Sequence, residues 1–304
     1  MVTAPPEALH EVAPGVLAYV QQPGGWCLNN AGVLVGDDAV AVVDTAATEV
    51  RARALRRAVA AVTPKPPRYV VNTHHHGDHT FGNFVFTPEA VVVGHETARA
   101  DMAERGLGLC AVWPHTDWGD IRLVLPTLTF EDRLTLRLGG LRAEVLHLGL
   151  AHTTSDTVVW VPEHGVLFAG DVVLSEVAPF CLMGSVAGTL RALDRLAALE
   201  GLRTVVCGHG PVCGPQVLDV TRRYLTRVQE LARWGVAREF TPLETARKAG
   251  LGAYAGLVDG ERLVANLHRA YAEEHGEPAG VRLPSAPIMR EMADFKGSPL
   301  VCEA

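Results

Sequence analysis

One six-residue segment, His-His-His-Gly-Asp-His, gathers side chains that commonly bind metal ions. His74 and His76 stand two positions apart after a Val-rich run, so extended backbone would point both to one side. Gly77 permits a tight turn that would bring Asp78 and His79 round to a second point. Four such ligands are too many for one open metal site. The spacing therefore favours two neighbouring metal ions over a solvated His-rich loop, and such pairs activate water and polarise carbonyl groups.

Four further candidates stand where strands of an α/β sheet would end. His152 follows AEVLHLGLA, Asp171 follows VLFAG and His209 follows RTVVCG, while Asp44 ends the run AVAVV. In α/β folds, ligands bind at the carboxyl ends of strands. A single histidine at a strand end is more often structural. A metal site is favoured because all four candidates are expected at the same edge of the predicted sheet.

Short apolar runs and amphipathic segments alternate along the chain up to residue 206, and these elements must position the candidates. Residues 49–62 and 186–199 predict helices, the second with Ser185 as its N-cap. Strands are predicted at 39–43, 68–71, 90–93, 143–147, 157–161, 165–168 and 203–206. This alternation predicts a layered α/β fold.

The pattern changes after residue 214, where long helical segments are followed by a Pro-rich tail. We expect a catalytic domain over residues 1–214 and a helical C-terminal extension over residues 215–304. Residues 106–128 have little periodicity but contain two tryptophans, which predicts an insertion that covers the site. The N-terminal residues MVTAPPEALH have no basic flank or apolar run, so no targeting segment is predicted.

Composition argues against several classes of function. The 304 residues contain 27 Lys and Arg against 34 Asp and Glu, a net charge of −7, which makes general binding of nucleic acid or an anionic membrane unfavourable. No apolar stretch reaches the roughly 20 residues that a membrane span needs. The six cysteines have irregular spacing and form no CxxC pair, so reduced thiols and a cytoplasmic location are expected.

Four separated motifs together resemble those of the metallo-β-lactamase superfamily, in the family's order. They are HHHGDH (74–79), AHTTSD (151–156), FAGD (168–171) and CGHG (207–210). The resemblance covers roughly residues 12–215. It implies a four-layer αββα sandwich, here with a helical C-terminal extension.

The same resemblance implies two Zn²⁺ ions and assigns their ligands. It places one zinc on His74, His76 and His152, the second on Asp78, His79 and His209, and Asp171 as a bridge between them. It places Asp44 behind the ligands, where it would orient them rather than bind metal. Asp78 would also act in catalysis by steering or accepting a proton.

Departures from the family's patterns narrow the choice among the branches of the superfamily. The β-lactamases of the superfamily do not use the bridging aspartate, so Asp171 argues against lactam hydrolysis. The diiron members carry Glu where this chain has His76, which argues for zinc and against reduction of O₂ or NO. Glutathione-thioester hydrolases share the metal motifs but bind glutathione through basic residues of a helical C-terminal region. Only one lysine, Lys248, lies between residues 200 and 290, so the sequence shows no match to the basic residues that bind glutathione.

Three segments are similar to the zinc-dependent cyclase/thioesterases of aromatic polyketide biosynthesis: residues 24–36, 42–49 and 152–162. This similarity implies a carrier-tethered polyketide substrate, with an acyl carrier protein as a partner, and ring-closing aldol condensation, thioester hydrolysis or both. The alternative is a two-zinc hydrolase of another small thioester, ester or lactone. A non-catalytic metal-binding scaffold is disfavoured because every ligand position is filled.

Either reaction needs a pocket for a flat apolar ligand, and several loop residues near the predicted rim are candidates. A plain core role is equally open for each of them. They are Trp26, Trp113, His115, Trp118, Phe180, Leu182 and Met183.

Two surfaces are candidates for contacts with other proteins. An acidic carrier protein could dock on a local basic run, although a solvated helix face is the better interpretation. The run comprises Arg51, Arg53, Arg56, Arg57, Lys65 and Arg68. The helical C-terminal part could equally form the interface of a homo-oligomer.

Overall fold

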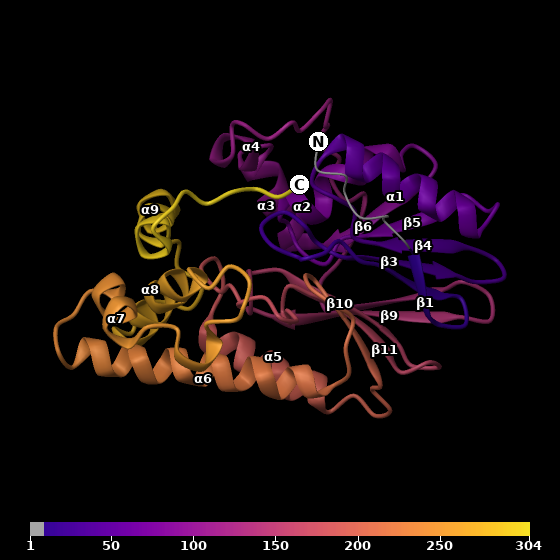
Figure 1. Ribbon diagram of the computed structural model, residues 1–304. Coiled ribbons are helices and arrows are strands. Elements are labelled where there is room, and N and C mark those ends of the chain that lie inside the picture. Colours follow the sequence, from indigo (N-terminus) through magenta and orange to yellow (C-terminus); the bar gives the residue numbers. More distant parts are fainter. Residues whose placement is uncertain (1–8) are drawn as a thin grey trace.

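Two β-sheets packed face to face form the centre of the computed structural model, which describes residues 9–304 (Figure 1). Alternating side chains of both sheets, such as Leu34, Val43, Val145 and Phe168, fill the space between them. Helices cover the two outer faces, so the layers run helix, sheet, sheet, helix. The predicted four-layer α/β sandwich with C-terminal helices is confirmed.

The first sheet has seven strands in the order of the sequence, β1 to β7. The strands β1 to β4 pair antiparallel, and β4 to β7 pair parallel. Their bounds are β1 Leu9–Ala13, β2 Val16–Tyr19, β3 Ala31–Val35, β4 Val40–Val43, β5 Pro67–Val71, β6 Val91–His95 and β7 Leu128–Phe130. The parallel half places the ends of β4 and β5, and the loops after them, at the same edge.

The second sheet has five strands in the order β12-β11-β10-β9-β8. All neighbours pair antiparallel except β11 and β12, which are parallel. The bounds are β8 Arg133–Arg137, β9 Arg142–Gly149, β10 Asp156–Val161, β11 Val166–Gly170 and β12 Thr204–Cys207. The loops after β9, β11 and β12 therefore leave the sheet beside one another.

Apolar faces of helices cover the first sheet. Leu55 and Val59 of α1, Glu49–Val62, pack on the side chains of Val42 and Val70. The other helical segments of this half are α2 Gly77–Thr80, η1 Phe81–Val85, α3 Glu96–Arg105 and α4 Leu109–Val112. The last of these lies in the predicted insertion.

The second sheet is covered by α5, Val186–Ala197, whose N-cap is Ser185, as predicted. The C-terminal helices continue from there: α6 Gln216–Val236, α7 Pro242–Ala249, η2 Gly252–Tyr254, α8 Arg262–Glu274 and α9 Ser285–Lys296. Leu167 of the sheet, Leu193 of α5 and Leu267 of α8 belong to one buried apolar cluster. The division at residue 214 stays a prediction.

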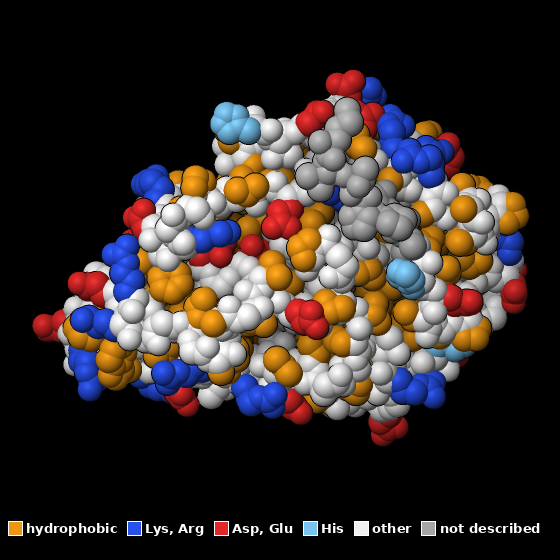
Figure 2. All heavy atoms as spheres, viewed as in Figure 1, with side chains coloured by type: hydrophobic (Ala, Val, Ile, Leu, Met, Phe, Trp, Pro, Cys, Tyr) orange, Lys and Arg blue, Asp and Glu red, His pale blue; other side chains and the backbone are white. Residues whose placement is uncertain are grey.

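The chain after α9 runs back across the molecule and ends close to α2 and α3 in Figure 1. There the backbone N–H of Glu303 donates to the carbonyl of Trp26 over 3.0 Å. The tail is thus docked beside the loop that carries Trp26. Among residues 9–304, every helix falls short of the length and apolarity needed to cross a membrane. On the face shown in Figure 2, acidic and basic side chains are interspersed, so this face has no large patch of a single charge.

Candidate metal centre

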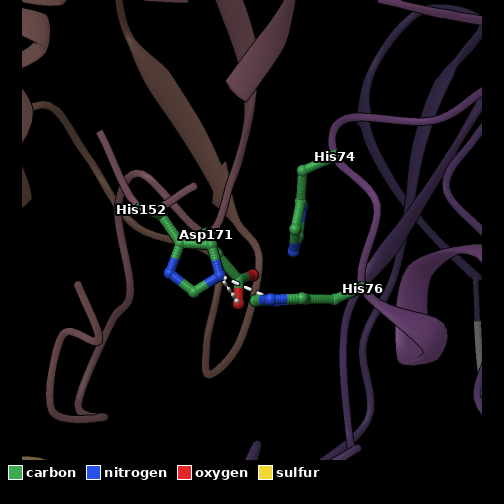
Figure 3. A group of neighbouring side chains, drawn as sticks. All are labelled: His74, His76, His152 and Asp171. Carbon is green, nitrogen blue, oxygen red and sulfur yellow. Dashed lines mark hydrogen bonds and ion pairs between the residues drawn. The ribbon is translucent and has the colours of Figure 1, made fainter. Parts of the chain in front are cut away.

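All seven predicted ligands meet at the edge where the loops of the two sheets leave. The first sheet supplies the loop and short helix after β5, and the second supplies the ends of β9, β11 and β12. In Figure 3, His74 and His76 reach from one side toward His152 and Asp171 on the other. The ligand atoms of these four residues all lie within 4.8 Å of one another. The same is true of a second group, Asp78, His79 and His209.

Asp171 lies between the two groups. Its Oδ2 is 3.5 Å from Nε2 of His152, a member of the first group, and 3.4 Å from Nε2 of His209, a member of the second. Its Oδ1 is 3.2 Å from Nε2 of His79. This single carboxylate therefore contacts histidines of both groups, which is the geometry that a bridging ligand requires.

The donor set fits metal ions, because its buried atoms are poorly satisfied by the protein alone. Nε2 of His74 is buried and makes no hydrogen bond, while Nε2 of His79 and Oδ1 of Asp171 make no hydrogen bond and only face each other at 3.2 Å. A buried polar atom without a partner costs about 1–3 kcal/mol, which a bound cation would offset. Imidazole and carboxylate ligands in two compact groups suit Zn²⁺ well.

The outer nitrogens of the histidines are held by other parts of the protein. Nδ1 of His79 donates to Oδ2 of Asp44 over 2.8 Å, and Nδ1 of His209 donates to the carbonyl of Gly24 over 3.0 Å. Nδ1 of His152 donates to the carbonyl of Phe180. Such bonds fix the ring orientation and leave Nε2 for a metal. Asp44 thus lies where the sequence places it, behind a ligand.

Two of the ligand histidines, His79 and His209, are held protonated by neighbouring carboxylates, whereas burial lowers the pKa values of His74 and His76 well below the ordinary value. Burial alone would lower the pKa of His209, but Asp171 and Asp78 outweigh it and raise this pKa to about 9. The same carboxylates, with Asp44, raise the pKa of His79. Burial would raise the pKa of Asp171, yet His209 and His79 hold it well below its ordinary value. Bound cations would take the place of these two protons.

A cavity of about 110 Å³ opens directly onto these ligands and is walled by aromatic rings. Trp26 lies 5.7 Å from Trp113 and 5.3 Å from Phe180, measured between ring centroids. Leu182 and Met183 complete this wall, and Met183 Sδ is 3.3 Å from Nε2 of His76. Five of the seven predicted pocket residues therefore line the cavity: Trp26, Trp113, Phe180, Leu182 and Met183.

Trp118 and His115 do not line this cavity, which corrects the prediction for both. Trp118 is buried, packs against Phe81 and donates its indole N–H to the carbonyl of Trp113 over 3.2 Å. It supports the wall from behind. His115 is exposed on the outside of the 106–128 segment.

Sequence reasoning missed several residues of the wall, above all Arg262. The residue is 2% exposed, and its guanidinium lies 4.1 Å from the ring centroid of Trp26 and donates to Oδ2 of Asp259 over 2.8 Å. The scarcity of lysine in this region suggested that no cation from it would reach the site, whereas an arginine on α8 carries the charge. The other missed lining residues are Cys27, Leu109, Val112, Ser285 and Met289. All six lie at least 30 positions from the nearest metal motif in the sequence, so only the fold brings them to the site.

Two proteins similar in sequence to this chain are named as enzymes. The type 2 metallo-beta-lactamase of Bacteroides fragilis is 24% identical over 235 residues, covering 73% of this chain and 87% of the relative. A hydroxyacylglutathione hydrolase of Methylococcus capsulatus is 28% identical over 179 residues, covering 56% of this chain and 61% of the relative.

Among solved structures, a metallo-beta-lactamase from Pontibacter korlensis has a TM-score of 0.61 at 20% identity. That match covers 72% of this chain and 98% of the other, and it shows the fold. Residues 24–209, more than half of the chain, match the metallo-beta-lactamase superfamily. The extent of that match, on this fold and with these converging ligands, shows that the chain belongs to the metallo-beta-lactamase superfamily of metal-dependent hydrolases.

Proposed function

We propose that this protein is a two-zinc enzyme that acts on an aromatic polyketide tethered as a thioester to an acyl carrier protein. The reaction is thioester hydrolysis, ring-closing aldol condensation or both. The observation that carries this proposal is the direct contact between the metal residues and an aromatic wall. His76, Asp78, Trp26, Trp113 and Phe180 all line one cavity.

The residues divide the work of holding the ions as the resemblance implies. His74, His76 and His152 would hold one Zn²⁺, and Asp78, His79 and His209 the other, with Asp171 between them. The ions would supply a Lewis acid for the substrate's carbonyl oxygen and would lower the pKa of a bound water.

Asp78 would be the residue that moves protons in this proposal. Its carboxylate lines the cavity, and Oδ2 is 3.3 Å from Nε2 of His209. Burial would raise its pKa, but His79 and His209 hold the pKa below the ordinary value, so it is ionised at neutral pH. It would accept a proton from water during hydrolysis, or from the carbon between two carbonyl groups during ring closure.

Trp113 offers a reason to expect an oxygenated aromatic substrate. Its side chain lines the cavity, yet its buried indole N–H has no acceptor. A buried tryptophan N–H normally finds a hydrogen-bond partner. A ring oxygen or carbonyl of a polyketide that lies against the side chains of Trp26 and Trp113 would accept this bond.

The size of the cavity implies that its cover moves when substrate enters. About 110 Å³ is well below the 300–1,000 Å³ typical of sites for drug-sized ligands. Leu109 and Val112 of α4 form part of the wall, and α4 has no buried residue. We infer that the 106–128 segment swings away from α9 to admit the acyl group.

A hydrolase of a small thioester is the second candidate. The relative from Methylococcus capsulatus is named a hydroxyacylglutathione hydrolase. Arg262 favours this candidate, because it places a cation from the C-terminal helices inside the metal pocket. A thioester with an acidic group near the carbonyl would suit that cation.

The proposed carrier-protein partner would meet a basic run whose charges are partly engaged. Nε of Arg53 is 2.7 Å from Glu49, while Nζ of Lys65 donates to the carbonyls of Gly36 and Asp37. Docking on this run and assembly as a homo-oligomer both remain proposals. All six cysteines are free, which supports a cytoplasmic location.

Metal analysis and two classes of substrate test the proposed function. We expect about two zinc ions per chain, and His76→Ala should lose metal and activity together. A carrier-bound bicyclic intermediate should be turned over at least about tenfold faster, by kcat/KM, than a simple acyl thioester. Turnover of simple thioesters alone would overturn the polyketide assignment and favour the second candidate. A single tightly held metal in the active protein would overturn the two-metal arrangement.

A further inference from the structure

A second cavity, of about 400 Å³, adjoins the metal pocket. Leu182, Met183 and Ser285 line both, so the two spaces meet at this shared wall. His75, which stands between the ligands His74 and His76 in the sequence, lines the second cavity. A substrate whose carbonyl lies at the metal residues would reach this space by passing Leu182, Met183 and Ser285.

A buried cation without a counter-ion forms part of the second cavity. Arg269 of α8 is 1% exposed, and within the described part of the chain no carboxylate lies within 4.0 Å of its guanidinium. Its Nε and Nη2 donate to the carbonyls of Leu182 and Val281. The acid one turn along α8, Glu273, accepts instead from Ser185 and from the first turn of α5. A buried charge normally has an ionic partner, and Arg269 has none among the described residues.

Two further arginines line the same cavity, Arg105 at the end of α3 and Arg282 in the segment before α9. Arg105 makes no side-chain hydrogen bond or ion pair in the described structure. Arg282 makes a two-point ion pair with Glu104 and lies 3.9 Å from Asp101, although the side chains of Arg282 and Glu104 are more than half exposed. An anionic ligand would compete with these carboxylates for Arg282. The guanidinium of Arg105 can therefore contact a ligand directly, whereas that of Arg282 would exchange one anionic partner for another.

His75 adds an unpartnered polar group inside the cavity. The side chain is 5% exposed, and neither ring nitrogen makes a hydrogen bond. The nearest acid is Asp101, whose Oδ2 is 3.6 Å from Nδ1 of His75 and already accepts from Oγ1 of Thr154 over 2.8 Å. Three arginines against Asp101 and Glu104 leave the lining with a positive balance.

We infer that this arginine cavity, defined by His75, Arg105, Arg269 and Arg282, binds an oxyanion on the part of the substrate that is remote from the reacting carbonyl. The group is a phosphate or a carboxylate, because guanidinium groups match the oxygens of both. The inference deepens the proposed function and rests on it only for the identity of the substrate. The anion site itself is testable without turnover.

Binding of matched ligand pairs to the zinc-loaded full-length protein tests the site. The first pair is S-methyl 4′-phosphopantetheine and S-methyl pantetheine, which differ by the phosphate. The second is S-methyl glutathione and its diethyl ester, which differ by two carboxylate charges. S-methylation keeps free thiols away from the metal residues. We expect the anionic member of at least one pair to bind about tenfold more tightly by calorimetry.

Variants locate the effect. Arg105→Gln and Arg282→Gln should each reduce the preference for the anionic ligand severalfold, and together they should abolish it. Arg137→Gln, at an exposed residue of β8, should leave it unchanged. Phosphate preference would indicate a carrier-type arm, and carboxylate preference a glutathione-type arm. Equal binding within both pairs, or a preference that survives Arg105→Gln with Arg282→Gln, would overturn the site. Neither result depends on whether polyketides are turned over.

Discussion

Asp44 shows how one residue outside the metal groups can control the centre. Its Oδ2 accepts from Nδ1 of His79, and both of its oxygens also accept from Thr73, through the backbone N–H and Oγ1 at 2.7 Å each. Its φ of 59° lies in the left-handed region, which a non-glycine residue rarely adopts. The strained backbone is tolerated because it presents a carboxylate to three donors at once.

We expect Asp44→Asn to weaken metal binding about 10- to 100-fold, the usual effect of removing such a supporting carboxylate. The amide keeps the size of the side chain but removes its charge and one acceptor oxygen. Competition with a coloured chelator measures the loss. Asp219→Asn, on the exposed face of α6, is the matched control. Unchanged affinity in Asp44→Asn would show that His79 needs no support.

The protonated histidines predict how stability of the metal-free protein depends on pH. The folded-state pKa of His209, about 9, lies above its ordinary value of 6.5. Its proton therefore stabilises the fold fully below about pH 6.5, and this contribution is lost as the pH rises through 9. The loss is on the order of 3 kcal/mol.

Urea unfolding of chelator-treated protein at pH 6.5, 8 and 9.5 measures this loss. Zinc-loaded protein is the control, because bound cations take the place of the protons and should flatten the profile. A metal-free protein equally stable at all three values would contradict the assigned protonation.

Because the indole N–H of Trp113 would contact substrate away from the metal ligands, its removal should change KM and not kcat. Trp113→Phe keeps an aromatic wall but removes the donor, so KM for an oxygenated aromatic thioester should rise about 3- to 10-fold with kcat little changed. The same variant should leave KM for an alkyl thioester unchanged. Equal effects on both substrates, measured by initial rates, would mean that this N–H does not contact the ligand.

At the scale of elements, strong local patterns made the prediction accurate and weak ones did not. The helix expected at 49–62 is α1 with the same bounds, because its apolar face and the cap at Thr48 are local features. The strands β1, β2, β3, β7 and β8 went unpredicted. Of these, β1, β7 and β8 lie at sheet edges and are partly exposed, so their sequences lack the continuous apolar runs of central strands. The strands β2 and β3 are short, buried apolar runs, and they were missed although that pattern is present in the sequence.

The ligand groups could be predicted from the metal motifs, whereas several residues of the pocket could be identified only from the three-dimensional structure. All seven predicted ligands converge, because each sits at a strand end or in a tight turn that the sequence encodes locally. Met289 and Arg262 reach the same cavity from helices beyond residue 250. No local pattern in those helices indicates which side chains face the site, since that depends on packing between distant segments.

Glu273 joins two elements, because it caps α5 from α8. Its carboxylate accepts from Oγ of Ser185 over 2.7 Å and from the backbone N–H of Val186 and Ala187. The positive end of the α5 dipole adds to these charge-assisted bonds. Glu273→Ala should lower the free energy of unfolding by about 2–3 kcal/mol.

Chemical denaturation measures this change, and the neighbouring Glu274→Ala is its control. Glu274 is nearly one-third exposed and lies 3.5 Å from Arg233, so its loss should cost at most about 1 kcal/mol. Equal losses in the two variants would show that the cap contributes nothing specific.

At the scale of the whole molecule, the C-terminal helices supply part of the substrate wall, through Arg262, Ser285 and Met289, but none of the metal ligands. Every metal ligand lies before residue 210. The C-terminal helices also hold the loop of Trp26, whose indole N–H donates to Glu261 over 3.0 Å, and Lys296 contacts the same carboxylate. The tail adds the bond from Glu303 to the carbonyl of Trp26.

This separation predicts the result of removing the tail alone. A chain ending at residue 297 loses the bond to the Trp26 carbonyl and the contact between the carbonyl of Glu303 and Nη2 of Arg51. Trp26 should then be held less firmly, so KM for an aromatic thioester should rise about 3- to 10-fold, the range that one or two hydrogen bonds can produce. Zinc content should match that of the full chain, because no ligand is removed. Val301→Ser in the full-length chain, at a 59% exposed position, controls for changes at the tail's surface. Loss of zinc together with substrate binding would contradict the separation, since it would mean that the tail stabilises the metal centre itself.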